Sequence, residues 1–462
     1  MRRAPAGLRR AQLPALLAVA ALVRGAFLAG FVPPFHGPDE PAHMDYVQRI
    51  AEHGRLPELR IHCQAYSLEA RALWDAAVKP IVFKPDRKLP DLGHPAPDPL
   101  DPRSRATTGC GPAATYPPLY YASAVPAYLA RADAPFLERL FAVRLVSVAW
   151  GAAAVWALYL AGAWWFRSRR AGLLVGILGV VQPMLGFLSS VVNSDAALFA
   201  CAAASFAALA VARRRPSARG PLVALGIATV AGVLSKPTFS IYLPVLGAAC
   251  VAALGVRARR SWARAAAAIA PAALTAALWS WYVRPAALEV IANPAGQLSK
   301  SGLDLGLRAY LRRFVFDSEL FYAIWNRMYW MTWGWVDTNL DPAWYHLLFA
   351  SVALAGAGVL LGWRTLRARD RGLVVLGAVA TAYAIVVMYL LEFLVMRSNG
   401  LSFVQGRYLL PLFPVHAAML LCGYRALGAR LSPLLDPAWA FVLTLVVVDL
   451  AALMRVLTRF YA

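Results

Sequence analysis

The sequence predicts an all-α, polytopic membrane protein with about 11 transmembrane helices and two large extracytoplasmic loops that bear juxtamembrane helices. Three observations lead to this fold class. The 462-residue chain is 60% hydrophobic, whereas soluble domains hold roughly 45–50% apolar residues. Its apolar segments are long enough to cross about 30 Å of hydrocarbon as helices. Clusters of Arg alternate with these segments, as the positive-inside rule requires.

The predicted spans are the apolar segments of membrane-crossing length. They cover residues 11–32, 137–166, 172–190, 195–212, 220–236, 239–256, 262–284, 343–363, 373–395, 407–426 and 436–458. The Arg clusters lie at the N-terminus and at 167–170, 213–219, 257–264, 364–371 and 425–430. With the N-terminus inside, every cluster falls in a cytoplasmic loop. We therefore expect a multi-pass protein of the cell membrane with a cytoplasmic N-terminus.

Two apolar segments need separate interpretations. Residues 116–129 include three prolines and are too short to span the bilayer. We expect an interfacial or juxtamembrane helix there, since its tyrosines suit the membrane–water boundary. The first segment follows a basic N-terminus and resembles a signal peptide. No small-residue cleavage site clearly precedes Pro33, and the segment is long enough to span, so we expect a retained first helix.

The topology predicts a single integral membrane domain over 1–462, with large extracytoplasmic loops at 33–136 and 285–342. The first loop carries an acidic motif. Residues 40–53 of this loop predict a helix, because an aspartate precedes them and a proline falls in the first turn. The second loop is rich in Trp, Tyr and Phe, which favour the membrane boundary, and we expect it to lie along the membrane surface.

The net charge of +22 comes from short basic clusters between apolar segments. Such clusters are typical of topology signals, so we expect no nucleic-acid partner. Cys201, Cys250 and Cys422 sit in apolar segments and are expected to be core residues. Cys63 and Cys110 share the first outer loop, where a disulfide would suit an oxidising compartment.

The most informative motif is the acidic one at 38–43, Pro-Asp-Glu-Pro-Ala-His. Its carboxylates lie at a membrane edge, where they are costly to desolvate. Asp39 could act as a general base towards an acceptor hydroxyl, with Glu40 orienting it or holding a metal, and His43 shares a helix face with Asp39. Helix capping is the alternative. One helix supplies too few ligands to argue a metal site strongly.

A second acid and a lysine are predicted to face the same compartment. Asp195 follows Asn193 where the third span turns into the fourth, and the alternative to a site role is an N-cap. Lys236 ends the fifth span on the outer side, against the positive-inside bias. A lysine there suggests an anionic partner such as a lipid phosphate, and snorkelling to the headgroups is the alternative.

Outer arginines also depart from the positive-inside rule. Arg139 and Arg144 open the second span, and Arg407 with Tyr408 opens the tenth. Bidentate contacts to phosphate would explain these arginines. Salt bridges to Asp195 or to residue 138, a glutamate, would explain them without a substrate. Together these groups suit an enzyme that takes a lipid-linked phosphate donor and activates an extracytoplasmic hydroxyl.

The motifs, in this order, resemble those of GT-C fold glycosyltransferases, the superfamily of protein O-mannosyltransferases and lipid A aminoarabinose transferases. The resemblance rests on the motifs at 38–43, 116–121, 139–147 and 193–195. The motifs at 333–337 and 403–411 look more like a bacterial branch of predicted membrane proteins of unassigned function within that superfamily.

The resemblance implies an inverting transferase that moves a sugar from a polyprenyl-phosphate donor to an extracytoplasmic glycan, lipid or protein acceptor, with membrane lipids as further partners. Asp39 matches the catalytic acid of the motif. The predicted catalytic residues are Asp39 and Glu40, and the predicted substrate-binding residues are His43, Asn193, Asp195, Lys236, Arg144, Arg407 and Tyr408. No Asp-x-Asp motif is present, so no metal or other cofactor is predicted.

Two other functions remain open from the sequence. An O-antigen polymerase or ligase also joins an outer loop to membrane arginines. A transporter or flippase of lipid-linked glycans would favour ionisable groups at mid-membrane and internal pseudo-symmetry. The spans here are largely uncharged in their middles and no inverted repeat is visible, which favours the transferase.

Overall fold

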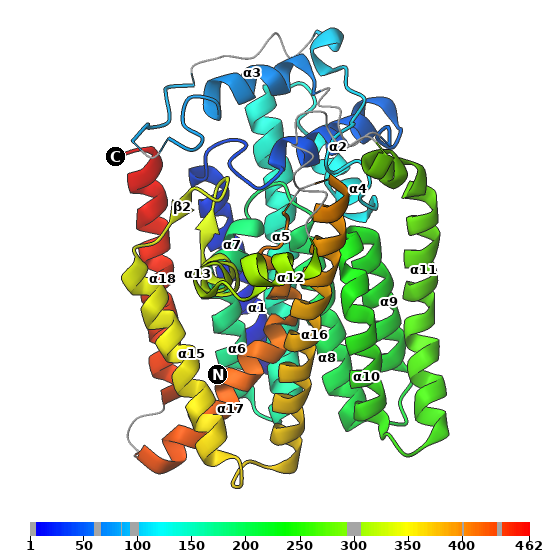
Figure 1. Ribbon diagram of the computed structural model, residues 1–462, viewed down its shortest axis with the longest axis vertical. Coiled ribbons are helices and arrows are strands. Elements are labelled where there is room, and N and C mark those ends of the chain that lie inside the picture. The colour runs from blue at the N-terminus through cyan, green and yellow to red at the C-terminus, as the bar shows by residue number, and fades with distance from the viewer. Residues whose placement is uncertain are drawn as a thin grey trace.

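The computed structural model describes residues 6–59, 66–84, 86–92, 101–292, 306–399, 402–431 and 437–462. It is almost entirely helical, which confirms the predicted all-α fold (Figure 1). Nine helical segments of the described chain are long and apolar enough to cross a membrane. They comprise α1 (Ala6–Phe31), α5 (Phe136–Phe166), α8 (Asp195–Arg214), η2 (Pro237–Tyr242) with α10 (Leu243–Leu254), α11 (Arg259–Ala292), α15 (Pro342–Gly362), α16 (Ala368–Asn399), η6 (Gly406–Leu412) with α17 (Phe413–Leu431), and α18 (Pro437–Phe460).

The predicted count of eleven spans is not confirmed. The third predicted span is broken into α6 (Arg169–Val181) and α7 (Pro183–Leu188). Pro183 has no N–H to continue the ladder, and the Gln182 side chain instead accepts a bond from the backbone of α7. The fifth predicted span is α9 (Gly220–Ser235), which is apolar but has only 16 residues. Both segments are therefore helical but shorter than the others.

Short helices cover one end of the bundle, at the top of Figure 1. This outer layer consists of α2 (Glu40–His53), α3 (Leu68–Ala77), η1 (Pro102–Arg105) and α4 (Leu119–Leu129). Helix α2 matches the helix predicted at 40–53. Helix α4 has 11 residues and does not span, as predicted. Cys110 of this layer is disulfide-bonded, and Cys63, its predicted partner, lies outside the described residues.

The second outer loop folds into short pieces that pack into the bundle. They are α12 (Leu307–Tyr310), the π-helical turns η4 (Leu311–Val315) and η5 (Ala323–Arg327), α13 (Ser318–Tyr322), α14 (Met328–Trp330), and the antiparallel strands β1 (Thr332–Trp333) and β2 (Thr338–Asn339). Trp333 is 1% exposed and stacks on Phe187 of α7, with ring centroids 4.9 Å apart. Phe316, in the first half of the loop, is 74% exposed. Because Trp333 is buried in the bundle, the expectation that the loop lies along the membrane surface is wrong for its second half.

A charged pair joins the first and last helices inside the bundle. The Arg24 guanidinium donates to both carboxylate oxygens of Asp449, with Nε 2.7 Å from Oδ2. A Cβ at position 186 would overlap this guanidinium, so a residue larger than Gly186 would require Arg24 to move. Sequence analysis missed the pair, because Arg24 and Asp449 are 425 residues apart in the chain.

The end of α18 holds the first outer loop. Arg459 donates to the carbonyl oxygens of Ile81 (3.0 Å), Lys84 (3.0 Å) and Arg87 (2.7 Å). The backbone N–H of Leu89 donates to the carbonyl of Phe460 at 2.8 Å. Because α18 is itself packed in the bundle, these bonds tie the outer layer to the spans beneath it.

Candidate active site

Asp39 has an unpaired side chain. It occupies the N-cap position of α2 with φ 54°, yet it makes no side-chain capping bond. The capping interpretation of Asp39 is therefore wrong. Its carboxylate makes no hydrogen bond or ion pair with any residue that the structure describes. Asp39 is half-buried and lines a cavity of about 380 Å³ together with Tyr66, Trp74 and Trp335.

Glu40, the next residue, is in the opposite situation. It is buried, and its Oε1 and Oε2 accept bonds of 2.7 Å each from Nε and Nη2 of Arg144. The backbone N–H groups of Val192 (2.9 Å) and Gly37 (3.2 Å) donate to the same carboxylate. Arg144 donates further to three carbonyl oxygens at the end of α1. Both groups are therefore satisfied by the protein, and the partner of Arg144 is neither Asp195 nor Glu138.

Asp195 and Lys236 form a second buried pair, with Nζ 2.6 Å from Oδ1. Asp195 is the first residue of α8 rather than its N-cap, and its N–H donates to the side chain of Asn193 at 2.8 Å. Its Oδ2 has no hydrogen-bond partner in the part of the chain that the structure describes. Lys236 is 2% exposed, so it does not snorkel. Its ammonium lies 5.5 Å from the ring centroid of Tyr116 and 5.7 Å from that of Tyr408.

Arg407 is a buried cation with unused donors. Its Nε and Nη1 have no hydrogen-bond partner among the described residues, and its guanidinium carbon lies 5.5 Å from the ring centroid of Tyr408. The segment before it is held by Glu392, which accepts from the backbone N–H groups of Phe403 (3.0 Å) and Val404 (2.9 Å). Sequence analysis missed Glu392, although an acid in an otherwise apolar span is a signal for such a role.

Two further residues, His43 and Tyr116, lie within electrostatic reach of these charged groups. His43 accepts from or donates to the Tyr121 hydroxyl at 2.7 Å, and burial, with Lys236 next in size, lowers the pKa of His43 to about 3. His43 is therefore neutral at physiological pH. Burial raises the pKa of Tyr116 well above its usual value, and the charges of Asp39 and Asp195 act in the same direction. Tyr116 thus lies within electrostatic reach of both acids.

The predicted site residues consequently gather at one end of the bundle, below the outer layer (Figure 1). They do not share one open space. Asp39 lines the larger cavity, while Arg407 lines a gap of about 10 Å³ beside Pro38. Asp195 and Lys236 are sealed beneath. The described residues contain no group of three or more His, Cys, Asp or Glu side chains placed to hold a metal ion.

Arg139 is not part of this cluster. Its guanidinium pairs with Glu69 of α3, with Nη1 2.9 Å from Oε1, and also donates to the Tyr128 hydroxyl. Gln48 donates to the same glutamate. This buried network joins α5 to the outer layer, and its charges are matched without a substrate.

Comparison with known proteins identifies the family. The family model described as "Predicted membrane protein (DUF2142)" matches residues 22–416. The chain belongs to this family. The match agrees with the predicted resemblance to membrane proteins of unassigned function, and the nine candidate spans agree with a multi-pass membrane protein. No curated protein matches the sequence.

Several solved structures are similar to this DUF2142 protein. ArnT from Cupriavidus metallidurans aligns with 93% of the chain at 18% identity, with a TM-score of 0.47 in the apo state and 0.48 when bound to undecaprenyl phosphate. The Archaeoglobus fulgidus oligosaccharyltransferase, in complex with zinc and sulfate, aligns with 96% of the chain at 13% identity and a TM-score of 0.47. The chain covers 61% and 62% of the two ArnT chains and 53% of the oligosaccharyltransferase.

Proposed function

We propose that the protein is an integral membrane glycosyltransferase, which moves a sugar from a polyprenyl-phosphate donor to an extracytoplasmic glycan, lipid or protein acceptor with inversion. One observation carries the proposal. The carboxylate of Asp39, which has no partner among the described residues, lies within electrostatic reach of Arg407, a buried cation with unbonded donors, in the part of the chain whose motifs resemble the GT-C active site. Inverting transfer needs a base for the acceptor and a cation for the leaving phosphate, and these two groups supply them.

Asp39 is the proposed general base. The acceptor hydroxyl gives its proton to the carboxylate while its oxygen forms the new bond to the anomeric carbon. The bond from that carbon to the donor phosphate breaks on the opposite face, and the phosphate leaves with the electron pair. Because Asp39 lines a cavity of about 380 Å³, an acceptor sugar has room to approach it.

Arg407 and Lys236 are the proposed phosphate-binding groups. The Nε and Nη1 groups of Arg407, which have no hydrogen-bond partner among the described residues, are donors that phosphate oxygens can take. Lys236 is already paired with Asp195, so its share in neutralising the phosphate is smaller, and Asp195 orients it. Asn193, His43 and Tyr408 would shape the wall around them.

Glu40 has a different proposed role from the predicted one. All of its bonds go to Arg144 and to two backbone N–H groups. A carboxylate held in this way cannot turn towards a substrate without leaving a buried charge unpaired. Glu40 is therefore a positioning residue, which fixes the loop that presents Asp39.

The test uses the full chain in lipid nanodiscs with a panel of undecaprenyl-phosphate hexoses and pentoses and a cell-envelope extract as acceptor. The readout is the release of undecaprenyl phosphate and the mass of the product. We expect Asp39→Asn to lower donor turnover by about 10²–10⁴-fold. The matched control is Asp133→Asn, an exposed acid of the same loop outside the site, which should retain turnover.

Each result bears on one function. Full turnover by Asp39→Asn contradicts the proposed base, and failure of the parent to bind or consume any donor contradicts the transferase. A product that grows by many sugars indicates a polymerase instead of single-sugar transfer. Movement of a lipid-linked sugar across the bilayer that survives Asp39→Asn indicates a transporter.

A further inference from the structure

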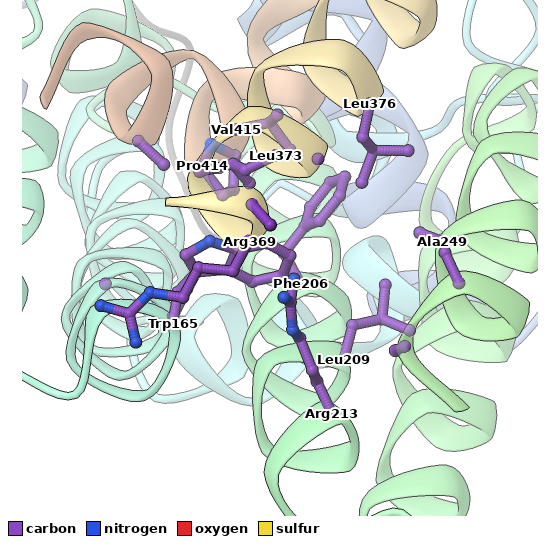
Figure 2. A pocket seen from close by; sticks show the side chains of 17 residues that line it. Trp165, Phe206, Leu209, Arg213, Ala249, Arg369, Leu373, Leu376, Pro414 and Val415 are labelled. Atoms are coloured by element: carbon purple, nitrogen blue, oxygen red, sulfur yellow. The ribbon is translucent and has the colours of Figure 1, made fainter. Parts of the chain in front are cut away.

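A second cavity, of about 360 Å³, is lined by residues near the end of α8 and the start of α16, away from the outer layer. Figure 2 shows the side chains that line it. Helices α5, α8, α10, α16 and α17 form its walls. The lining is apolar except for Arg213, near the end of α8, and Arg369, near the start of α16. Ligand pockets commonly measure about 300–1,000 Å³. The cavity could therefore take an apolar chain with an anionic head.

Two neighbouring arginines at this end are held in different ways. Arg214 donates to the carbonyl oxygens of Trp164 (3.1 Å) and Trp165 (2.6 Å). Arg213 stacks on the Trp165 ring instead, with its guanidinium carbon 4.8 Å from the centroid. It makes no hydrogen bond or ion pair with another described residue. Stacking therefore fixes the plane of Arg213 and leaves its N–H groups free for an anion.

Arg369 is only partly neutralised. Its Nε lies 3.3 Å from Oδ1 of Asp370, and this contact uses one of the five N–H donors of the guanidinium. The Arg369 side chain is 21% exposed. The carboxylate of Asp370 also attracts the Arg213 guanidinium electrostatically. Two guanidinium groups and one carboxylate leave the mouth of the cavity with a net positive charge.

Topology alone does not account for this arrangement. Arginines that serve only as positive-inside signals are expected to be exposed to the headgroups. Arg215 and Arg367 are exposed in this way. Arg213 and Arg369 are less exposed and line an apolar cavity between helices. Basic pockets of this kind on the cytoplasmic side of membrane proteins recognise anionic lipid headgroups.

We propose that this cavity binds an anionic phospholipid of the surrounding leaflet. The phosphate lies between Arg213 and Arg369, and one acyl chain enters the cavity beside Phe206 and Leu373. The site is separate from the candidate active site, and the proposal does not depend on the proposed transferase activity.

The experiment titrates the full chain, purified in a neutral detergent, with phosphatidylglycerol, with phosphatidylcholine of the same acyl chains, and with inorganic phosphate. Native mass spectrometry gives the affinity and thermal unfolding gives the stabilisation. We expect phosphatidylglycerol to bind about tenfold more tightly than phosphatidylcholine, and phosphate alone to have no effect. Equal binding of the two lipids, or equal stabilisation by phosphate alone, overturns the proposal.

Matched variants locate the site. Arg213→Gln with Arg369→Gln should weaken phosphatidylglycerol binding about tenfold, whereas Arg215→Gln with Arg367→Gln removes the same charge from the same end and should not. Equal loss from the two double variants means diffuse surface charge and overturns the proposal.

A second pair of variants tests the chain-binding part without changing charge. A Cβ added at Gly372 meets no atom within 4 Å, so Gly372→Leu fills the cavity without displacing its walls. Gly356 of α15 has equal space and does not line the cavity, so Gly356→Leu is the control. Gly372→Leu should lower the affinity and Gly356→Leu should not. Unchanged binding by a folded Gly372→Leu overturns the proposal even if the arginine variants fail to fold.

Discussion

The pair Glu40–Arg144 and the group formed by Asp39 and Arg407 lie close together and have the same kinds of charge. In the first, the carboxylate accepts four hydrogen bonds and the guanidinium donates to it and to three carbonyl oxygens. In the second, the carboxylate has no partner among the described residues, and two nitrogens of the guanidinium form no hydrogen bond with them. The difference separates charged groups that stabilise the fold from charged groups that remain available to a ligand. Three predictions on buried charged residues test this distinction, beginning with the largest effect.

Removing Glu40 should cost the most stability. Glu40→Ala leaves the buried Arg144 without its counter-ion, which typically costs about 3–5 kcal/mol. The measurement is the free energy of unfolding by denaturant in detergent micelles. Glu138→Ala is the control, because Glu138 is exposed and lies 4.0 Å from Arg131, so its loss should cost no more than about 1 kcal/mol. If Glu40→Ala is as stable as this control, the pair does not hold the loop.

The buried Asp45 should make stability depend on pH. Burial raises the pKa of Asp45 from 3.8 to about 7, against the opposing bond from Thr107. The folded state therefore binds more protons than the unfolded state between these values. Stability from this group is fully present below pH 3.8 and is lost as the pH rises through about 7.

Asp45→Asn should remove this dependence and gain on the order of 4 kcal/mol relative to the parent as the pH rises from 4 to 8. Unfolding measured across this range tests it. Asp75→Asn, at an exposed acid paired with Lys79, should follow the parent. If the difference in the free energy of unfolding between Asp45→Asn and the parent stays constant over this pH range, Asp45 is ionised in the folded protein throughout the range.

Replacing Arg407 should have the smallest effect on stability. Its Nε and Nη1 have no partner to lose among the described residues, and its contact with the Tyr408 ring is the main loss, so Arg407→Gln should change the free energy of unfolding by only about 1–2 kcal/mol. The same variant should lose most of the affinity for undecaprenyl phosphate, measured by native mass spectrometry. Destabilisation as large as that of Glu40→Ala, with lipid binding retained, would place Arg407 among the structural charges.

Local patterns in the sequence predicted much of the fold. The apolar segments and Arg clusters identified the long helices, and the aspartate before residues 40–53, with the proline in their first turn, identified α2. The break at Gln182 was missed, because its cause is a side chain that replaces backbone hydrogen bonds. Arg24 and Asp449 were missed because they are 425 residues apart and meet only in the folded bundle.

The sequence predicted which residues form the candidate site and at which end of the bundle they lie, but not which of them form ion pairs with each other. The sequence placed Asp39, Asp195, Lys236 and Arg407 at one end, where the structure brings them together. It could not distinguish Glu40 from Asp39, since both are adjacent acids in one motif. Their difference depends on Arg144, 104 positions away from Glu40, and on the positive φ that turns Asp39 away.

The hydrogen bonds from Arg459 to the first outer loop also set an order of events in biosynthesis. Ile81 leaves the ribosome 378 residues before Arg459, which corresponds to roughly 20–75 s at about 5–20 residues per second. During that time the loop has been made but lacks its attachment to α18. The outer layer is thus among the first parts of the protein to be synthesised, and it is completed only when the final helix enters the membrane.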